Sequence, residues 1–269
     1  MAEAGVVANT ASALMCRVAV VLPAFNEEES LGATLDELLV CLGTVDGMPV
    51  QYEVVVVDDG STDHTRDLAR RRGLSVLSHP CNLGYGASVA TGLRYAACRS
   101  AHAAVLMDAD GQHDPGAIPR LLRPVLAGEA DVAIGSRYLA GGGYRSSLSR
   151  RAGSALFAGL LSLVARRRVR DTTSGFQCIG REVILELADS YPTDYPDAQV
   201  ILQLLLSGRR VAEVPASVRP RRAGRSMHSW LSAFRYPPRM VLSLLVVLLR
   251  FGLSRLSARK PTGDRGGVR

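Results

Sequence analysis

The sequence is poor in aromatic residues, which make up 5% of its 269 residues and include a single Trp. Its net charge is +7, and basic loops occur at 139–151 and 219–229. A basic protein could bind nucleic acid, but single-strand binding relies on aromatic side chains on which bases stack. Because few aromatic residues accompany the arginines, we expect no nucleic-acid partner.

Cysteine is also scarce and shows no metal-binding spacing. The five cysteines are an odd number and include no Cys-x-x-Cys pair. This argues against a disulfide framework and a zinc site, and it is typical of a reducing compartment. The N-terminal segment has acid rather than base before its weak apolar run, so it makes a poor signal peptide.

The usual phosphate-binding loops are missing. The glycine-rich stretch NLGYGASVATG at 82–92 is neither a Walker loop nor a G-x-G-x-x-G fingerprint, and alone it indicates only close backbone approach. A sugar-phosphate nucleotidylyltransferase would carry a glycine-rich, basic loop after its first strand, whereas PAFNEEE at 23–29 is acidic. A nucleotide site in this chain would therefore use other side chains.

Apolar runs alternate with helical patterns over the first half of the chain. Continuous Val and Ile runs between helices are typical of a parallel sheet covered on both faces, so the sequence predicts an α/β fold. Strands are predicted at 17–23, 52–60, 74–79, 103–110, 131–137 and 211–215, and helices at 27–42, 62–72, 86–98, from 115 onward, 152–165, 180–189 and 197–208.

The basic character belongs to the C-terminal tail. Residues 232–269 contain eight bases against one acid. Their net charge of +7 equals the net charge of the whole chain. The apolar run at 240–249 has arginines on both sides and is shorter than the roughly 20 apolar residues of a membrane span. We expect a helix lying in an anionic membrane interface. A buried core helix and an oligomer contact are the alternatives.

Three predicted strands end in acidic and amide side chains, in the stretches PAFNEEE (23–29), VDDGSTD (57–63) and MDADGQHDP (107–115). In an open α/β sheet, ligands bind beyond the carboxyl ends of the strands. We therefore expect these side chains to gather on one rim and to form a ligand site. They are Asn26, Glu27, Asp58, Asp59, Asp108 and Asp110.

Asp108 and Asp110 form an Asp-x-Asp pair that suits a hard divalent cation such as Mg²⁺ or Mn²⁺, which takes oxygen ligands. The cation would offset the repulsion between the carboxylates and bridge to a diphosphate. A neutral imidazole is a lesser ligand for Mg²⁺, so we expect His113 to position a neighbour or to be simply exposed. Asp-x-Asp without a phosphate loop points to nucleotide-sugar chemistry.

At this point the chain resembles family 2 glycosyltransferases of the GT-A fold, in the branch of dolichyl- and polyprenyl-phosphate mannose or glucose synthases. Each matching stretch is common alone, whereas eight in the family's order are specific, and together they cover residues 18–227. They are LPAFNEEESL, VVVDDGSTDHT, NLGYGASVATG, MDADGQHDP, IGSRY, DTTSGFQCIGREV, VAEVP and RPRRAGRS. The resemblance implies a Rossmann-like, mostly parallel sheet with helices on both faces. The expected organisation is an N-terminal extension (1–16), a GT-A domain (17–229) and a membrane-associating helix with a disordered basic tail (230–269).

The resemblance implies roles at matching positions. Nucleotide-sugar binding would fall to Pro23, Phe25, Glu27, Asp58, Asp59, Gly84, Asp108, Ala109 and Arg137. The metal and diphosphate would be held by Asp108, Asp110 and Gln112, and the acceptor or its phosphate by Arg221, Arg225 and Ser226. The catalytic assignments are Asp110, Arg137 and Asp171.

The implied reaction is inverting displacement at the anomeric carbon of a nucleoside-diphosphate hexose, with cation and arginines stabilising the leaving group. Met227 stands where these synthases usually have Lys, and YPDAQVIL at 195–202 lacks an acid common in dolichyl-phosphate mannose synthases. The sugar (glucose, mannose or N-acetylglucosamine) and the acceptor therefore stay open, and the sequence does not choose between UDP and GDP.

Two acceptor classes fit the sequence. A phosphate monoester is already mostly dianionic at pH 7 and needs positive charge rather than a base. A hydroxyl of a soluble natural product or glycan needs a base, and Asp171 is the best candidate. We expect a polyprenyl phosphate and an enzyme on the cytoplasmic face of the cell membrane, attached through 232–260; whether it forms a homo-oligomer stays open.

Overall fold

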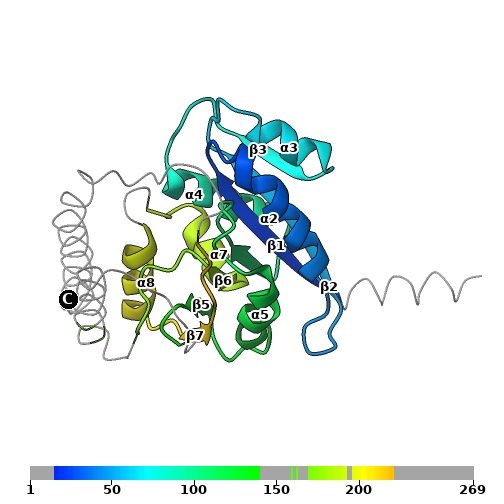
Figure 1. The fold of residues 1–269 in the computed structure, drawn as a ribbon. Helices are drawn as coiled ribbons and strands as arrows, with labels where there is room; N and C mark the ends of the chain where they lie inside the picture. The colour runs from blue at the N-terminus through cyan, green and yellow to red at the C-terminus, as the bar shows by residue number, and fades with distance from the viewer. Residues whose placement is uncertain (1–14, 140–158, 160–161, 163–168, 193–195, 221–269) are drawn as a thin grey trace, which may run out of the picture. The chain divides into compact units, whose positions relative to one another are not determined.

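The computed structural model describes residues 15–139, 159, 162, 169–192 and 196–220. Its centre is a seven-stranded sheet with the strand order β3-β2-β1-β4-β6-β5-β7 (Figure 1). The strands are β1 (Cys16–Ala24), β2 (Val50–Asp58), β3 (Ser75–Ser78), β4 (Ala103–Leu106), β5 (Val132–Ser136), β6 (Gln177–Gly180) and β7 (Val211–Pro215). In this sheet β6 runs antiparallel to both neighbours, and the other strands run parallel to one another.

The predicted α/β fold with a mostly parallel sheet is confirmed, and one strand was missed. β6 reads Gln-Cys-Ile-Gly, a four-residue segment without a Val or Ile run, so nothing in its local pattern marks a strand. It becomes a strand because β4 and β5 present free backbone groups on either side of it. The strand predicted at 103–110 ends at Leu106, before the acidic segment.

The helices follow the predicted alternation closely. They are α2 (Glu28–Cys41), α3 (Thr65–Arg71), α4 (Tyr85–Cys98), the 3₁₀ turn η1 (Pro115–Ala117), α5 (Ile118–Leu126), α7 (Arg181–Ala188) and α8 (Pro196–Leu206). Residues 159 and 162 are helical, and the rest of the helix predicted at 152–165 lies outside the described residues.

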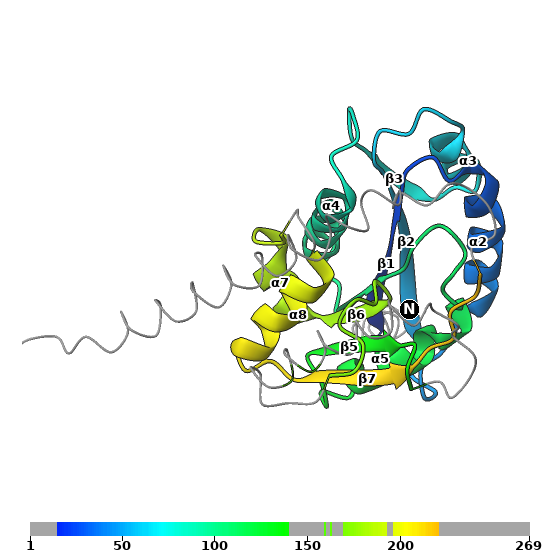
Figure 2. The same cartoon turned by 60° about the vertical axis from the view of Figure 1, so that its left-hand side comes forward.

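Helices cover both faces of the sheet because alternate strand residues point to opposite sides. Val18, Val20 and Leu22 of β1 share one apolar core with Leu31 and Leu35 of α2, and α5 joins the same cluster. On the other side lie α4, α7 and α8 (Figure 2). There α4 packs so closely on β1 that a Cβ added at Gly92 would stand 2.1 Å from Cγ1 of Val21.

The topology directs several loops to one edge of the sheet. The parallel strands β1, β2, β4 and β5 all end at this edge, which is where α/β proteins bind ligands. Because β6 is antiparallel, it begins there instead, with Gln177 beside Leu106 and Ile134. The segment before β6, which contains Asp171, therefore lies at the same edge of the sheet as Asp108 and Arg137.

The predicted interfacial helix and the tail at 230–269 lie outside the described residues, as do residues 1–14. The expected domain boundaries therefore stay predictions. Within the part of the chain that is described, no helix combines the length and the apolar character needed to cross a bilayer.

Candidate active site

The ends of β1 and β2 are joined by side chains that bond the partner segment's backbone. The Asn26 amide donates to Ser61 Oγ at 3.0 Å, and the Thr62 amide donates to Asn26 Oδ1 at 2.8 Å. Asn26 has φ 53°, a left-handed conformation that Asn tolerates better than most residues. The Glu27 amide donates to Thr65 Oγ1 at 2.8 Å. PAFNEEE and VDDGSTD thus form one continuous edge.

Ser30, in the first turn of α2, connects this edge to the Asp-x-Asp segment. Its hydroxyl lies 2.6 Å from Glu27 Oε2 and 3.2 Å from the Ala109 carbonyl oxygen, which Thr34 Oγ1 also approaches at 3.3 Å. Ala109 separates Asp108 from Asp110, so the loop bearing both carboxylates is fixed on α2. The structure thus gathers the three acidic strand ends at one rim, as the sequence predicts.

Asp58 and Asp59 are both buried and directed into the protein. Asp58 Oδ1 accepts a hydrogen bond from the Ser61 amide at 3.1 Å. Asp59 accepts from the amides of Leu83 and Gly84 at 2.9 and 2.8 Å. In the structure these two carboxylates therefore shape the loops around the predicted nucleoside site. Of the other residues expected there, Pro23 is buried within β1, and Phe25, just after the strand, is half-buried.

Asp108 and Asp110 follow β4 in a tight turn. The Asp110 carboxylate accepts from the Gln112 amide at 3.0 Å, and Gly111 between them has φ 75°, which suits glycine. The described residues contain no group of three or more His, Cys, Asp or Glu placed to hold a metal ion. The oxygen donors present still fit a hard cation. Asp108 and Asp110, with the Gln112 amide oxygen, would supply part of its coordination.

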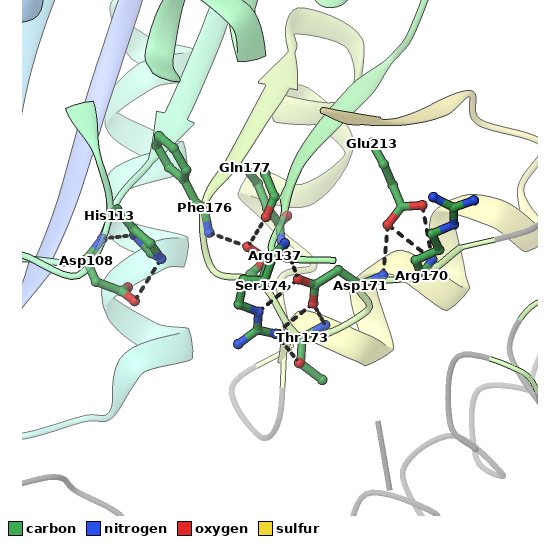
Figure 3. Close-up of polar contacts among 11 residues, drawn as sticks. Asp108, His113, Arg137, Arg170, Asp171, Thr173, Ser174, Phe176, Gln177 and Glu213 are labelled. Atoms are coloured by element: carbon green, nitrogen blue, oxygen red, sulfur yellow. Dashed lines mark hydrogen bonds and ion pairs between the residues drawn. The ribbon is translucent and has the colours of Figure 1, made fainter. Parts of the chain in front are cut away.

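His113 positions the first of these carboxylates. Its Nδ1 accepts from the Asp108 amide at 3.1 Å, and its Nε2 lies 3.8 Å from Asp108 Oδ2 (Figure 3). The ring stacks on Phe176, with 4.9 Å between centroids and 13° between planes. His113 is only 7% exposed, so the alternative that it is a simple surface residue is wrong.

Two further segments meet the Asp-x-Asp loop. A Cβ added at Gly175 would stand 2.9 Å from Tyr85 Oη and 3.4 to 3.5 Å from the carboxylate oxygens of Asp108, so a larger residue here would displace the Tyr85 hydroxyl. From the other side, the Arg219 amide donates to the Gln112 carbonyl at 2.9 Å. The chain therefore reaches the start of RPRRAGRS beside this loop. Arg221, Arg225 and Ser226 lie outside the described residues.

Arg137, after β5, is held by Asp171 from the segment before β6 (Figure 3). Its Nη2 donates to Asp171 Oδ1 at 2.6 Å, and its Nε and its backbone amide donate to Oδ2 at 2.8 and 2.9 Å. Nη2 also donates to Thr173 Oγ1 at 2.7 Å. The guanidinium is thus fixed in a bidentate pair, which is the strong form of this interaction.

The Asp171 segment is itself fixed by β7. The carboxylate of Glu213 accepts from the amides of Arg170 and Asp171, with the Asp171 contact at 2.8 Å. Asp171 is fully buried, and Arg137 occupies both of its oxygens. A carboxylate held this way has no lone pair directed at a substrate hydroxyl, so the geometry disfavours the general-base role considered for Asp171. The geometry instead favours a role in which Asp171 orients the Arg137 guanidinium.

A cavity of about 500 Å³ opens at the opposite edge of the sheet, where β1 and β2 begin. Arg17, Tyr52, Glu53 and Arg99 are among its lining residues, and Arg99 pairs with Glu53 at 2.9 Å. It contains none of the predicted site residues. We place the chemistry at the acidic rim because ligands of parallel sheets bind at the carboxyl ends.

Comparison with known proteins identifies the family. A model of glycosyl transferase family 2 matches residues 19–187. The chain belongs to this family. The family 2 relatives include a dolichol-phosphate mannosyltransferase of Pyrococcus furiosus, 31% identical over 82% of this chain, and a polyprenol monophosphomannose synthase of Mycolicibacterium smegmatis, 34% identical over 79%. The resemblance to the polyprenyl-phosphate hexose synthase branch is therefore confirmed.

The extent of these matches differs. The alignment spans 61% of the length of the Pyrococcus relative and 81% of the Mycolicibacterium relative. Among solved structures, glucosyl-3-phosphoglycerate synthase of Mycobacterium tuberculosis superposes with a TM-score of 0.66 at 23% identity, covering 88% of this chain and 81% of that one. This likeness confirms the predicted GT-A fold of a family 2 glycosyltransferase.

The sequence motifs did not predict that Ser30 and Glu213 belong to the site. Both lie inside stretches that carry the family resemblance, LPAFNEEESL and VAEVP. Their roles depend on contacts made across the chain, from Ser30 to Ala109 and from Glu213 to Asp171. No spacing rule within one stretch could have found them.

Proposed function

We propose that this family 2 enzyme transfers a hexose, with inversion, from a nucleoside-diphosphate sugar to a lipid-linked acceptor, preferably a polyprenyl phosphate. The observation that carries the proposal is the rim on which Ser30 joins the Glu27 carboxylate to the Asp-x-Asp loop. Close to it, Arg137 provides a cation held in a fixed orientation by Asp171. An acidic edge with a fixed arginine suits a cation-bridged diphosphate that gains charge as it leaves.

The donor half of the site uses the loops at the ends of β1, β2 and β4. Asp108, Asp110 and Gln112 would hold a Mg²⁺ or Mn²⁺ ion, which supplies positive charge to the departing diphosphate. Glu27 and Gly84, with the loops that Asp58 and Asp59 hold, would form the nucleoside pocket. Arg137 adds a second positive charge that needs no reorganisation during the reaction.

The geometry of Asp171 favours a phosphate acceptor over a hydroxyl. An alcohol would need a carboxylate within hydrogen-bond reach, and the candidate carboxylate is buried and bound to Arg137. A phosphate monoester has its second pKa near 6, so it attacks as a dianion without a base. The names of the Pyrococcus and Mycolicibacterium relatives, which refer to dolichol phosphate and polyprenol, support the same choice.

Membrane attachment is the remaining part of the proposal. A polyprenyl phosphate presents its head group at a bilayer surface. The basic tail, with eight bases against one acid in 232–269, has the charge to hold the enzyme at an anionic membrane surface. The acceptor phosphate would then approach the rim from the membrane side, where Arg221 and Arg225 are expected to bind it.

The test is a transfer assay with a panel of labelled nucleotide sugars, UDP- and GDP-linked, in the presence of Mn²⁺. Each donor is incubated with and without undecaprenyl phosphate, and label is extracted into chloroform. We expect one donor to give chloroform-soluble label that depends on both the lipid and the metal. Transfer to a water-soluble acceptor without lipid would replace this proposal by the soluble-acceptor alternative.

A further inference from the structure

A histidine beneath the rim, with a largely buried side chain, has no role in the mechanism described so far. His79 follows β3, and its side chain is 10% exposed, beside the 5% exposed side chain of Asp59. Its Nδ1 lies 2.7 Å from Asp59 Oδ1, and its Nε2 lies 2.9 Å from Thr91 Oγ1 in α4. Because a carboxylate only accepts hydrogen bonds, the tautomer that fits this pair has Nδ1–H donating to Asp59 and leaves Nε2 to accept from the Thr91 hydroxyl.

Asp59, which His79 holds in place, in turn holds the glycine-rich loop. Its two carboxylate oxygens accept from the amides of Leu83 and Gly84. Gly84 has φ 95° and ψ 161° at the start of α4, a conformation open to glycine and strained for other residues. On the underside, a Cβ added at Gly60 would stand 2.5 Å from the carbonyl carbon of Cys81. The loop is therefore held from below, while Asn82 and Leu83 remain exposed.

The loop held by Asp59 is connected through the first turn of α4 to the neighbourhood of Asp108. Helix α4 begins at Tyr85, immediately after Gly84. Tyr85 Oη and the Asp108 carboxylate both lie against Gly175, each within 3.5 Å of the position where a Cβ would stand. A change in the loop at 82–84 would therefore shift the first turn of α4 relative to Asp108.

We propose that His79 is a positioning residue of the donor site. Through Asp59 it fixes the loop at 82–84 and, with it, the first turn of α4 beside Asp108. The histidine reaches no substrate itself. It acts by keeping the Asp59 carboxylate aligned with two backbone amides, and Thr91 prevents the ring from rotating away. This assignment rests on the proposed function, since the donor nucleotide is what the loop would contact.

Three substitutions separate the two contacts of the ring. His79→Asn retains an amide donor near the position of Nδ1, so it can still bond Asp59. His79→Gln extends its amide toward Thr91 and leaves Asp59 without this donor, and His79→Ala removes both contacts. His64→Ala is the matched control, because the His64 side chain is 80% exposed and its ion-pair partner is Asp67 of α3.

Two measurements test the proposal. The first is hydrogen exchange at the amides of Leu83 and Gly84 in the nucleotide-free protein. We expect faster exchange in His79→Ala and His79→Gln, and near wild-type exchange in His79→Asn and His64→Ala.

The second measurement is the affinity for UDP and GDP with Mn²⁺, together with donor KM and kcat. In His79→Ala we expect the nucleotide Kd and donor KM to rise about tenfold, the size typical of a buried polar contact that is lost. We expect kcat to change much less and His79→Asn to recover most of the affinity.

The outcomes separate this assignment from the proposed function. Unchanged exchange at Leu83 and Gly84 in His79→Ala would overturn the positioning role, as would faster exchange with unaltered nucleotide affinity. If His79→Ala does not fold, equal behaviour of His79→Asn and His79→Gln overturns it. If wild-type protein binds neither nucleotide, the proposed function fails, and so does the assignment to a donor site.

Discussion

Arg137 and Asp171 lie 34 residues apart in the sequence and form a bidentate ion pair, with Nη2–Oδ1 and Nε–Oδ2 distances of 2.6 and 2.8 Å. The Asp171 side chain is fully buried, and that of Arg137 is 17% exposed. The buried carboxylate therefore sets the direction of the guanidinium. The pair therefore presents a fixed positive charge at the rim.

Replacing Asp171 by Asn should weaken both the fold and the catalysis. Removing one partner of a buried ion pair typically costs about 3 to 5 kcal/mol, and we expect a loss near the lower figure because Arg137 retains access to water. Transfer should fall by about 10²-fold, since the arginine would no longer be fixed where charge develops. Urea unfolding and steady-state kinetics measure the two effects.

The pH dependence of this variant distinguishes positioning from base catalysis. If Asp171 were the base, kcat would lose its low-pH limb in Asp171→Asn. We expect the shape of the profile to persist at a lower rate. Asp46→Asn is the control, because the Asp46 side chain is 68% exposed in its pair with Arg123. Loss of the limb without loss of stability would restore Asp171 as a base.

Asp110→Asn should abolish transfer while leaving the fold intact. The substitution keeps the side-chain oxygen that accepts from the Gln112 amide but removes the negative charge expected to hold the cation. We expect transfer to fall by at least about 10²-fold and Mn²⁺-dependent nucleotide binding to weaken. Calorimetric titration with UDP and GDP, with and without Mn²⁺, checks this. Full activity in Asp110→Asn would refute the metal assignment.

Asp131, before β5, gives a test of stability against pH. Its carboxylate accepts from the Arg210 guanidinium at 2.8 Å and from the Arg210 amide at 2.7 Å. The pKa of Asp131 is lowered, first by the hydrogen bond from the Arg210 side chain. A carboxyl with a lowered pKa stabilises the fold above its unfolded-state pKa of about 3.9, and this stabilisation is lost as pH falls through the folded-state value.

Asp131→Asn should therefore lower Tm at pH 7, and the difference from wild type should shrink as the pH falls below about 4. Thermal unfolding across a pH series measures the gap. Asp189→Asn serves as the control, since that side chain is 94% exposed. A gap that stays constant down to pH 2, roughly two units below the unfolded-state pKa, would contradict the linkage.

Deleting residues 232–269 should release the protein from anionic vesicles and leave nucleotide binding largely intact. The deletion removes seven net positive charges and the apolar run at 240–249. Vesicle co-sedimentation measures attachment. A full-length variant in which the flanking Arg235, Arg239, Arg250 and Arg255 are changed to Gln separates charge from apolar burial. Equal vesicle binding before and after truncation would remove the interfacial-helix hypothesis.

Much of the fold was open to prediction from local pattern. The Val-rich runs of β1 and β2 and the leucine spacing of α2 carry their periodicity in the sequence. The acidic strand ends were predicted to converge because parallel strands end at the same edge, and Ser30 confirms it by joining Glu27 to Ala109. The membrane tail, the metal ligands and the acceptor arginines remain predictions.

The sequence alone determined the α/β class, the family and the residues at the ends of the strands, because these depend on periodicity and on short motifs. Only the tertiary structure decided that β6 runs antiparallel, that Asp171 therefore meets Arg137, and that His79 lies beneath Asp59. The reason is physical. A four-residue strand and a buried ion pair are stabilised by partners distant in the chain, and no local pattern encodes which partner will be adjacent.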